Sequence, residues 1–270
     1  MSIYQDLAAG MHMTNANLTE KLQEWIDGYV DDTSIFTNID ETHEIPTAKS
    51  IAKQLQSDAS IWERLLSATG GKVELTKCFY YILQWEFDEE GVPSHMSKQK
   101  LEAMGVQIQI KETGKDQPTK IKHLDCDEAH RTLGVYKTIT GNQMEQKKQT
   151  SQKGETITRA VGAATFTRKQ TKTAWNAIYI PGVTYLSVAT YLQEKELVQI
   201  ESKAIMVFLP KMGYNRTTAR AVVYGPAEQG GIGIKSLYAE QSIAQITALM
   251  QHTRLYSPLE KTIRKNLDWV

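Results

Sequence analysis

The stretch that most constrains the fold is Leu22–Asn38, LQEWIDGYVDDTSIFTN, which holds two short runs of strand-forming residues around a pair of aspartates. β-Branched and aromatic residues on both sides of a two-residue polar break are typical of a β-hairpin. The pattern therefore predicts a hairpin with Asp31 and Asp32 at its tip.

Two adjacent carboxylates repel each other, and a divalent cation would offset that cost. Mg²⁺ takes hard oxygen ligands and is typically held by one or two carboxylates together with substrate phosphates. Two such ions about 4 Å apart can clamp the attacking and leaving oxygens of a phosphoryl transfer. Asp31 and Asp32 are thus candidate ligands for Mg²⁺ or Mn²⁺. The alternative is that Asp-Asp is simply a common turn.

The tetrapeptide Tyr29-Val30-Asp31-Asp32 resembles the Y-x-D-D hairpin of reverse transcriptases, the RNA-directed DNA polymerases, of the retrotransposon type. The resemblance implies a palm subdomain that performs two-metal nucleotidyl transfer on an RNA template and a DNA primer. It also implies that Asp31 and Asp32 are the catalytic, metal-binding residues and that Tyr29 contacts substrate or primer.

A second segment resembles the same family. Gly71, Val73, Leu75 and Lys77 follow a pattern that precedes a strand in these enzymes, where the lysine lies near the incoming triphosphate. A cation there can stabilise or protonate the departing pyrophosphate. The resemblance makes Lys77 a catalytic candidate, with Lys72 as a fallback, whereas the plain alternative is a surface lysine beside a strand.

Two glycine turns extend the resemblance. Arg131–Tyr136 resembles the Leu-Gly turn that grips the primer backbone, which implies primer contacts for Leu133 and Gly134. Gly230–Ile234 resembles a Gly-Gly-aliphatic-Gly turn downstream of the thumb. That segment lacks the frame of a phosphate-binding loop, and we interpret it as a structural turn.

The net charge is zero, but the charges are unevenly distributed. Residues 1–46 carry nine acids and one base, whereas residues 131–172 carry nine bases and two acids. An acidic pole beside a basic pole suits a polymerase, although two unrelated solvated faces would give the same count. In the family the thumb packs its basic side on the template–primer duplex, so the resemblance implies that the contacts to the nucleic-acid backbone are Lys147, Lys148, Arg159, Arg168, Lys169 and Lys172. Such contacts are independent of sequence and sensitive to salt.

Hydrophobic periodicity predicts an α+β chain, with antiparallel strands and packed helices at 1–140 and a mainly helical region at 141–270. The resemblance implies that the first region is a partial palm and that the second is a thumb-like region. We expect a loop at 11–19, strands at 78–87, 106–111 and 120–125, and helices at 47–68, 142–174, 185–200, 201–208 and 239–252. The strands at 106–111 and 120–125 alternate apolar and polar residues, as half-buried strands do.

The palm's other metal-binding aspartate and the fingers lie upstream of the hairpin in the family, and Asp31 is too close to Met1 to leave room for them. We therefore expect a C-terminal fragment with a missing N-terminal polymerase segment, weakly active or inactive alone, that binds Mg²⁺ only if the site is completed. The alternatives are a non-catalytic nucleic-acid-binding remnant of a retroelement and a decayed reading frame.

The remaining features describe the class of protein. At 270 residues and 41% hydrophobic composition, the chain can bury a core, and no apolar run approaches the ~20 residues of a membrane helix. Cys78 and Cys126 are too few for a disulfide scaffold and are expected to be reduced thiols of an intracellular protein. The nucleus and the cytoplasm cannot be distinguished.

Overall fold

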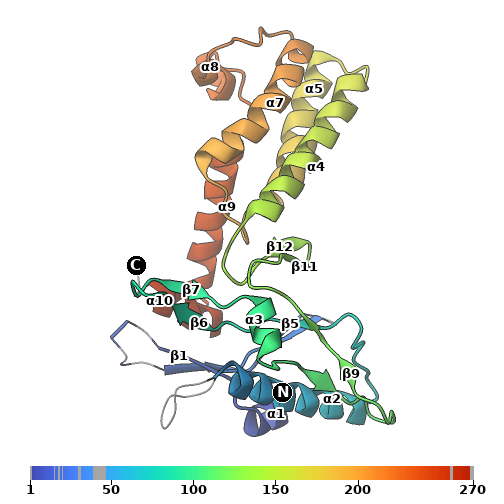
Figure 1. Cartoon of the computed structure of the whole chain (residues 1–270). Helices are drawn as coiled ribbons and strands as arrows, with labels where there is room; N and C mark the ends of the chain where they lie inside the picture. The colour runs from blue at the N-terminus through green and yellow to red at the C-terminus, as the bar shows by residue number, and fades with distance from the viewer. Residues whose placement is uncertain are drawn as a thin grey trace. The chain divides into compact units, whose positions relative to one another are not determined.

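The structure is a computed structural model that describes residues 2–14, 16–17, 19, 21–29, 32–38, 47–255 and 258–267. The chain forms two compact units. Unit 1 comprises Met1–Glu128 and Ser257–Val270, and unit 2 comprises Ala129–Tyr256. Figure 1 shows the elements of each unit.

Unit 1 combines helices with short strands. Its helices are α1 (Ser2–Leu7), α2 (Ala48–Ala68), α3 (Lys98–Ala103) and α10 (Pro258–Leu267). Its strands are β1 (Met11–Thr14), β2 (Lys21–Glu24), β3 (Ile26–Tyr29), β4 (Asp32–Ile35), β5 (Phe79–Tyr80), β6 (Trp85–Phe87), β7 (Pro93–His95), β8 (Gln109–Ile110), β9 (Thr119–Lys120) and β10 (Lys122–His123).

These strands form five separate two-stranded sheets, four antiparallel and one, β10 with β5, parallel. The predicted hairpin is confirmed: β3 pairs antiparallel with β4, and Tyr29 lies opposite Asp32. Asp32 is thus the first residue of a strand, and the two residues between the strands, Val30 and Asp31, lie outside the described residues. The loop expected at 11–19 was wrong in part, because Met11–Thr14 pairs with Lys21–Glu24.

The core of unit 1 lies between α2, α3 and the strands that follow α2. Its buried hydrophobic residues are Ala48, Ala52, Leu75, Tyr80, Ile82, Leu101, Val106, Ile108, Ile110 and Ile121. The predicted helix at 47–68 is confirmed, since Thr47 caps α2 through a capping box with Ser50. Helix α1 packs on α2 through the edge-to-face contact of Tyr4 with Trp62, whose ring centroids are 5.6 Å apart.

Unit 2 is mainly helical. It contains the hairpin of β11 (His130–Thr132) and β12 (Val135–Lys137). Its helices are α4 (Met144–Ala163), α5 (Arg168–Ala174), α6 (Ile180–Thr184), α7 (Glu194–Met212), α8 (Arg220–Tyr224) and α9 (Leu237–His252), with a π-helix η1 (Trp175–Tyr179) and a 3₁₀ turn η2 (Ala227–Gln229).

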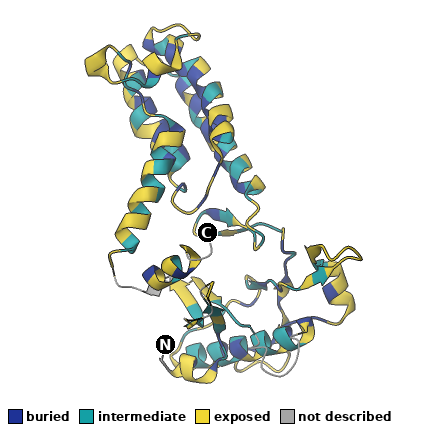
Figure 2. Cartoon of the chain, turned by 90° about the vertical axis from the view of Figure 1, so that its left-hand side faces the viewer, coloured by how far each residue is buried: buried dark blue, intermediate teal, exposed yellow. Residues whose placement is uncertain are grey.

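The core of unit 2 is centred on three aromatic rings. Trp175 and Tyr179 stack with centroids 4.6 Å apart, and Phe208 of α7 contacts Trp175 edge-on at 5.0 Å. Figure 2 shows buried residues along the facing sides of these helices and exposed residues on their outer sides. Gly154 of α4 faces α7, where a Cβ would lie 3.5 Å from Ile200, at ordinary contact distance. Pro181 in α6 lacks an N–H donor, and the π-turn of η1 precedes it.

Five predicted elements differ from the structure. The strand at 78–87 is split into β5 and β6, and the strands at 106–111 and 120–125 are reduced to short pairs. The helix at 142–174 is broken between Ala163 and Arg168, where Thr167 caps a new helix through a capping box with Gln170. The helix expected at 185–200 was wrong at its start, since α7 begins at Glu194 and runs through the segment expected at 201–208.

The mixed composition of helices and small, mostly antiparallel sheets agrees with the predicted α+β class. The structure divides the chain after Glu128 and not after residue 140, so the β11–β12 hairpin belongs with the helices, whereas α10 belongs to unit 1. Among the described helices, none is both long and apolar enough to cross a membrane.

Candidate functional site

The β3–β4 hairpin carries acidic side chains on one of its faces. Cross-strand partners share a face, and so do residues two apart along a strand. The register therefore places Asp27, Asp32 and Ser34 on one face, with Asp32 opposite the backbone of Tyr29. Asp27 and Asp32 are both exposed. Asp27 was missed from sequence; its spacing of two from Tyr29 was the available signal.

Among the described residues, this face offers two carboxylates to a metal. Asp27 and Asp32 are oxygen donors of the kind that Mg²⁺ takes. The described residues contain no group of three or more His, Cys, Asp or Glu side chains that could hold a metal ion. Asp31, the other predicted ligand, lies outside the described residues, and of Tyr29 only the backbone is described. We therefore derive no catalytic step through a metal.

The predicted catalytic lysine lies in a turn of unit 1. Lys77 is exposed, and its amide donates to the carbonyl of Glu74 over 3.0 Å. The hydroxyl of Thr76 lowers the pKa of the Glu74 carboxyl, and the nearby charge of Lys77 adds to this effect. No hydrogen bond or ion pair between described residues joins Lys77 to Asp32. The fallback, Lys72, forms an ion pair with Glu112 at 2.8 Å.

The predicted primer-contacting turn is the tip of the β11–β12 hairpin. Leu133 and Gly134 both have positive φ, 50° and 87°, as a two-residue type I′ turn requires. Leucine rarely adopts this conformation, which costs about 1–3 kcal/mol for a residue other than glycine. Leu133 is also 54% exposed. A strained, exposed leucine at a turn motivates a functional hypothesis for Leu133. This turn belongs to unit 2, whereas Asp32 and Lys77 belong to unit 1.

The predicted backbone-binding residues divide into two groups. Lys147 pairs with Glu196 at 3.0 Å, and Lys148 pairs with Glu145 at 3.6 Å. A hydrogen bond from the amide of Gln193 is the largest cause that lowers the pKa of Glu196, and one from the side chain of Gln149 is the largest that lowers the pKa of Glu145; the two lysines add to these effects. These two lysines are therefore largely neutralised within unit 2.

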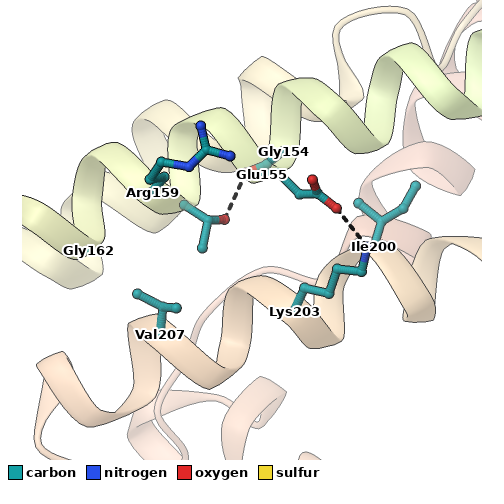
Figure 3. A pocket seen from close by; sticks show the side chains of 8 residues that line it. Gly154, Glu155, Arg159, Gly162, Ile200, Lys203 and Val207 are labelled. Carbon is teal, nitrogen blue, oxygen red and sulfur yellow. Dashed lines mark hydrogen bonds and ion pairs between the residues drawn. The ribbon is translucent and has the colours of Figure 1, made fainter.

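Arg159 lines a groove of about 390 Å³ between α4 and α7 (Figure 3). Glu155 of α4 and Lys203 of α7 form an ion pair across it at 2.6 Å, and Ile200 and Val207 are apolar lining residues. Lys203 lowers the pKa of Glu155, with a minor contribution from Arg159. Because one acid faces two bases, this groove is only weakly positive.

The second group lies at one end of unit 2, where the link between α4 and α5 meets the end of α7. The guanidinium of Arg168 lies against Gly213, because a Cβ on that glycine would be 2.7 Å from Cζ of Arg168. Lys211 donates to the carbonyl of Ala164 over 2.5 Å. The link between α4 and α5 is thereby held to the C-terminal end of α7. Lys169, which follows Arg168, is exposed.

Further bases follow Arg168 and Gly213 along the chain. Lys172 lies one turn along α5, with Nζ 3.6 Å from the position of a Cβ on Gly233. Arg220 begins α8, and its charge lowers the pKa of the buried Glu201, although burial raises that pKa overall. We define the basic end by five exposed or half-buried residues, Arg168, Lys169, Lys172, Arg216 and Arg220.

None of these five side chains forms an ion pair with another described residue. Arg216 and Arg220 were not predicted from sequence, because the excess of bases was recognised only within residues 131–172. The available signal was the absence of acids: residues 156–193 and 202–227 contain no Asp or Glu.

The glycine turn at 230–234 is structural, as its sequence predicted. The amides of Gly230, Gly231 and Gly233 donate to Ala227, Pro226 and Gly225. Trp175 and Asn176 of η1 hold the backbone of Lys235 at 2.8 and 3.2 Å. These amides are thus already used within the loop.

Comparison of the chain with protein-family models, with curated proteins and with solved structures gives no match.

Proposed function

We propose that this protein binds nucleic acids through their phosphate backbone and that it does so with the basic end of unit 2. The observation that carries the proposal is that the guanidinium of Arg168 lies against Gly213 and that none of the five bases forms an ion pair with a described acid, although Arg220 lies near the buried Glu201. Arginine suits this role because its planar, permanently charged fork matches phosphate geometry. The reverse transcriptase resemblance supports the same ligand class.

Salt dependence tests this proposal. Backbone binding releases counterions, so log K falls linearly with log salt, with a slope of about −0.9 for each neutralised phosphate of a duplex. We expect the double variant Arg168→Gln/Arg216→Gln to weaken binding of a fluorescently labelled RNA–DNA hybrid and to reduce the slope by about 2. Fluorescence anisotropy between 50 and 200 mM salt measures both effects.

The matched control is Lys147→Gln/Lys148→Gln, which removes the same charge from lysines that are ion-paired in the structure. We expect a smaller change in slope. Equal losses in both variants would show that only net charge matters. A hybrid that does not bind at 50 mM salt would contradict the proposal outright.

A second candidate is a polymerase-like activity, favoured by the exposed Asp32 on a confirmed hairpin and by the strained Leu133. We propose reverse transcriptase ancestry with weak or absent activity in the isolated chain. The test is primer extension with Mg²⁺ or Mn²⁺ on an RNA template. Extension lost in both Asp31→Ala and Asp32→Ala, but kept in Asp6→Ala, would establish a functional site.

A further inference from the structure

Two exposed aromatic rings accompany the basic end. Phe166 lies in the link between α4 and α5 and is 39% exposed, and Tyr214 follows Gly213 and is 45% exposed. Figure 1 shows the link between α4 and α5 and the segment that follows α7 at the same end of helices α4, α5 and α7. Phe166 is two residues before Arg168 and Tyr214 directly follows Gly213, so both residues lie next to the place where Arg168 lies against Gly213.

The backbone around these rings is well fixed. Gly213 ends α7 in a left-handed conformation with φ of 89°, and the amide of Tyr214 donates to the carbonyl of Leu209 over 2.9 Å. The capping box of Thr167 and Gln170 fixes the residue that follows Phe166. Both side chains are thus presented from ordered turns and not from long loops.

The exposure of these two rings contrasts with the aromatic core of unit 2, although Tyr185, Tyr191 and Tyr238 are also exposed. Trp175, Tyr179 and Phe208 are each 0% exposed and form the core. Phe166 has no polar atom that would favour its contact with water. An aromatic ring beside a guanidinium is the combination on which an unpaired base can stack while its phosphate is bound.

We propose that the basic end is a binding site for single-stranded nucleic acid, in which Phe166 and Tyr214 stack on bases while Arg168, Lys169 and Arg216 bind the flanking phosphates. This inference rests on the proposed function and specifies its ligand. In a duplex the base faces are already stacked on each other, so these rings contribute only to binding of an unpaired strand. Stacking of this kind has little preference for sequence.

The test compares labelled 20-nucleotide dT and U oligonucleotides with a 20-base-pair DNA duplex by fluorescence anisotropy. Stacking is worth about 1–3 kcal/mol per base, which is roughly a fivefold to 150-fold change in affinity. We expect Phe166→Ala and Tyr214→Ala each to weaken binding of the single strands at least fivefold and to leave the duplex unchanged. Equal losses for dT and U would assign both nucleic acids to the site.

Three controls sharpen the result. Phe166→Leu keeps apolar area without the ring and should behave like Phe166→Ala. Tyr238→Ala removes a ring that is 41% exposed on α9, outside the basic end, and should change nothing. Arg168→Gln should weaken single strands and duplex alike. Circular dichroism confirms that each variant keeps its helical content.

The failures are distinguishable. If single strands and duplex bind equally and the ring variants match the wild type, the single-strand inference is wrong while the proposed function stands. If neither ligand binds, both are wrong. If Phe166→Leu binds as the wild type does, the ring provides only apolar area, and stacking is excluded.

Discussion

The two units of this protein satisfy their buried groups to different degrees. Unit 2 has a core of eighteen buried hydrophobic residues, whereas the core of unit 1 has ten, counted over the described residues. All described side chains with buried polar atoms that have no hydrogen-bond partner lie in unit 1: Tyr4, Trp25, Thr37, Asp58 and His123. Each such atom costs about 1–3 kcal/mol. We therefore expect unit 1 to be the less stable unit.

Unit 2 shows how buried polar groups can be satisfied. Glu201 is 3% exposed, and its carboxylate accepts from the amide of Leu237 over 3.1 Å at the start of α9. Gln241 bonds both the amide and the carbonyl of Leu192. These hydrogen bonds join segments that are far apart in the sequence. Glu201 and Gln241 therefore both stabilise the fold of unit 2 and fix which segments pack together.

The largest predicted effect concerns the aromatic core of unit 2. Phe208 is 0% exposed and contacts both Trp175 and Tyr179. Phe208→Ala should lower the free energy of unfolding of unit 2 by about 3–5 kcal/mol, from lost burial and the cavity left behind. Urea unfolding followed by hydrogen exchange separates the two units. The variant should lower protection in α4 and α7 and spare α2; equal losses in α2 would mean that the units unfold together.

A smaller effect, of opposite sign in the two units, is expected when the pH falls from 7.5 to 5. Burial lowers the pKa of His123, so its neutral form stabilises unit 1 above the ordinary histidine pKa of about 6.5, and this contribution is lost as the pH falls. Burial raises the pKa of Glu201, so the strain of its charged form in unit 2 is relieved as the pH falls. Hydrogen exchange measured at both pH values checks each sign.

Matched variants isolate these two groups from the other titrating residues. His123→Phe keeps a ring stacked on Tyr80, where the present centroids are 4.6 Å apart, and should remove the loss of stability in unit 1. Glu201→Gln keeps an oxygen for the amide of Leu237 and should remove the gain in unit 2. A wild-type response that persists in either variant would assign the effect to another residue.

The elements that the sequence predicted correctly are those that depend on local signals. The β3–β4 hairpin and helix α2 follow from local signals, strand-forming runs around a break and the Thr47–Ser50 cap. The break before Arg168 was also readable, because Thr167 and Gln170 form a capping pair three residues apart. The apolar residues on both sides of this break led to the prediction of one continuous helix at 142–174.

The basic end could not be predicted as a site, because it depends on contacts between segments. Arg168 and Gly213 are neighbours only in the folded unit, and so are Lys211 and Ala164. Similarly, the strand expected at 78–87 is interrupted where its residues pair with distant ones: the carbonyl of Tyr80 accepts from the amide of Leu124. Periodicity identifies which residues are buried but not the partners that they meet.

The smallest predicted effect compares two buried tyrosines. The hydroxyl of Tyr4 in unit 1 has no described partner, whereas that of Tyr179 in unit 2 donates to the carbonyl of Ile200 at 3.5 Å. Tyr4→Phe should therefore leave the stability of unit 1 unchanged or raise it by up to about 1 kcal/mol, while Tyr179→Phe should cost unit 2 about 0.5–1 kcal/mol. Urea midpoints of the two variants measure both. A loss in Tyr4→Phe equal to that in Tyr179→Phe would show that the units satisfy their polar groups equally, because only a bonded hydroxyl loses stability when it is removed.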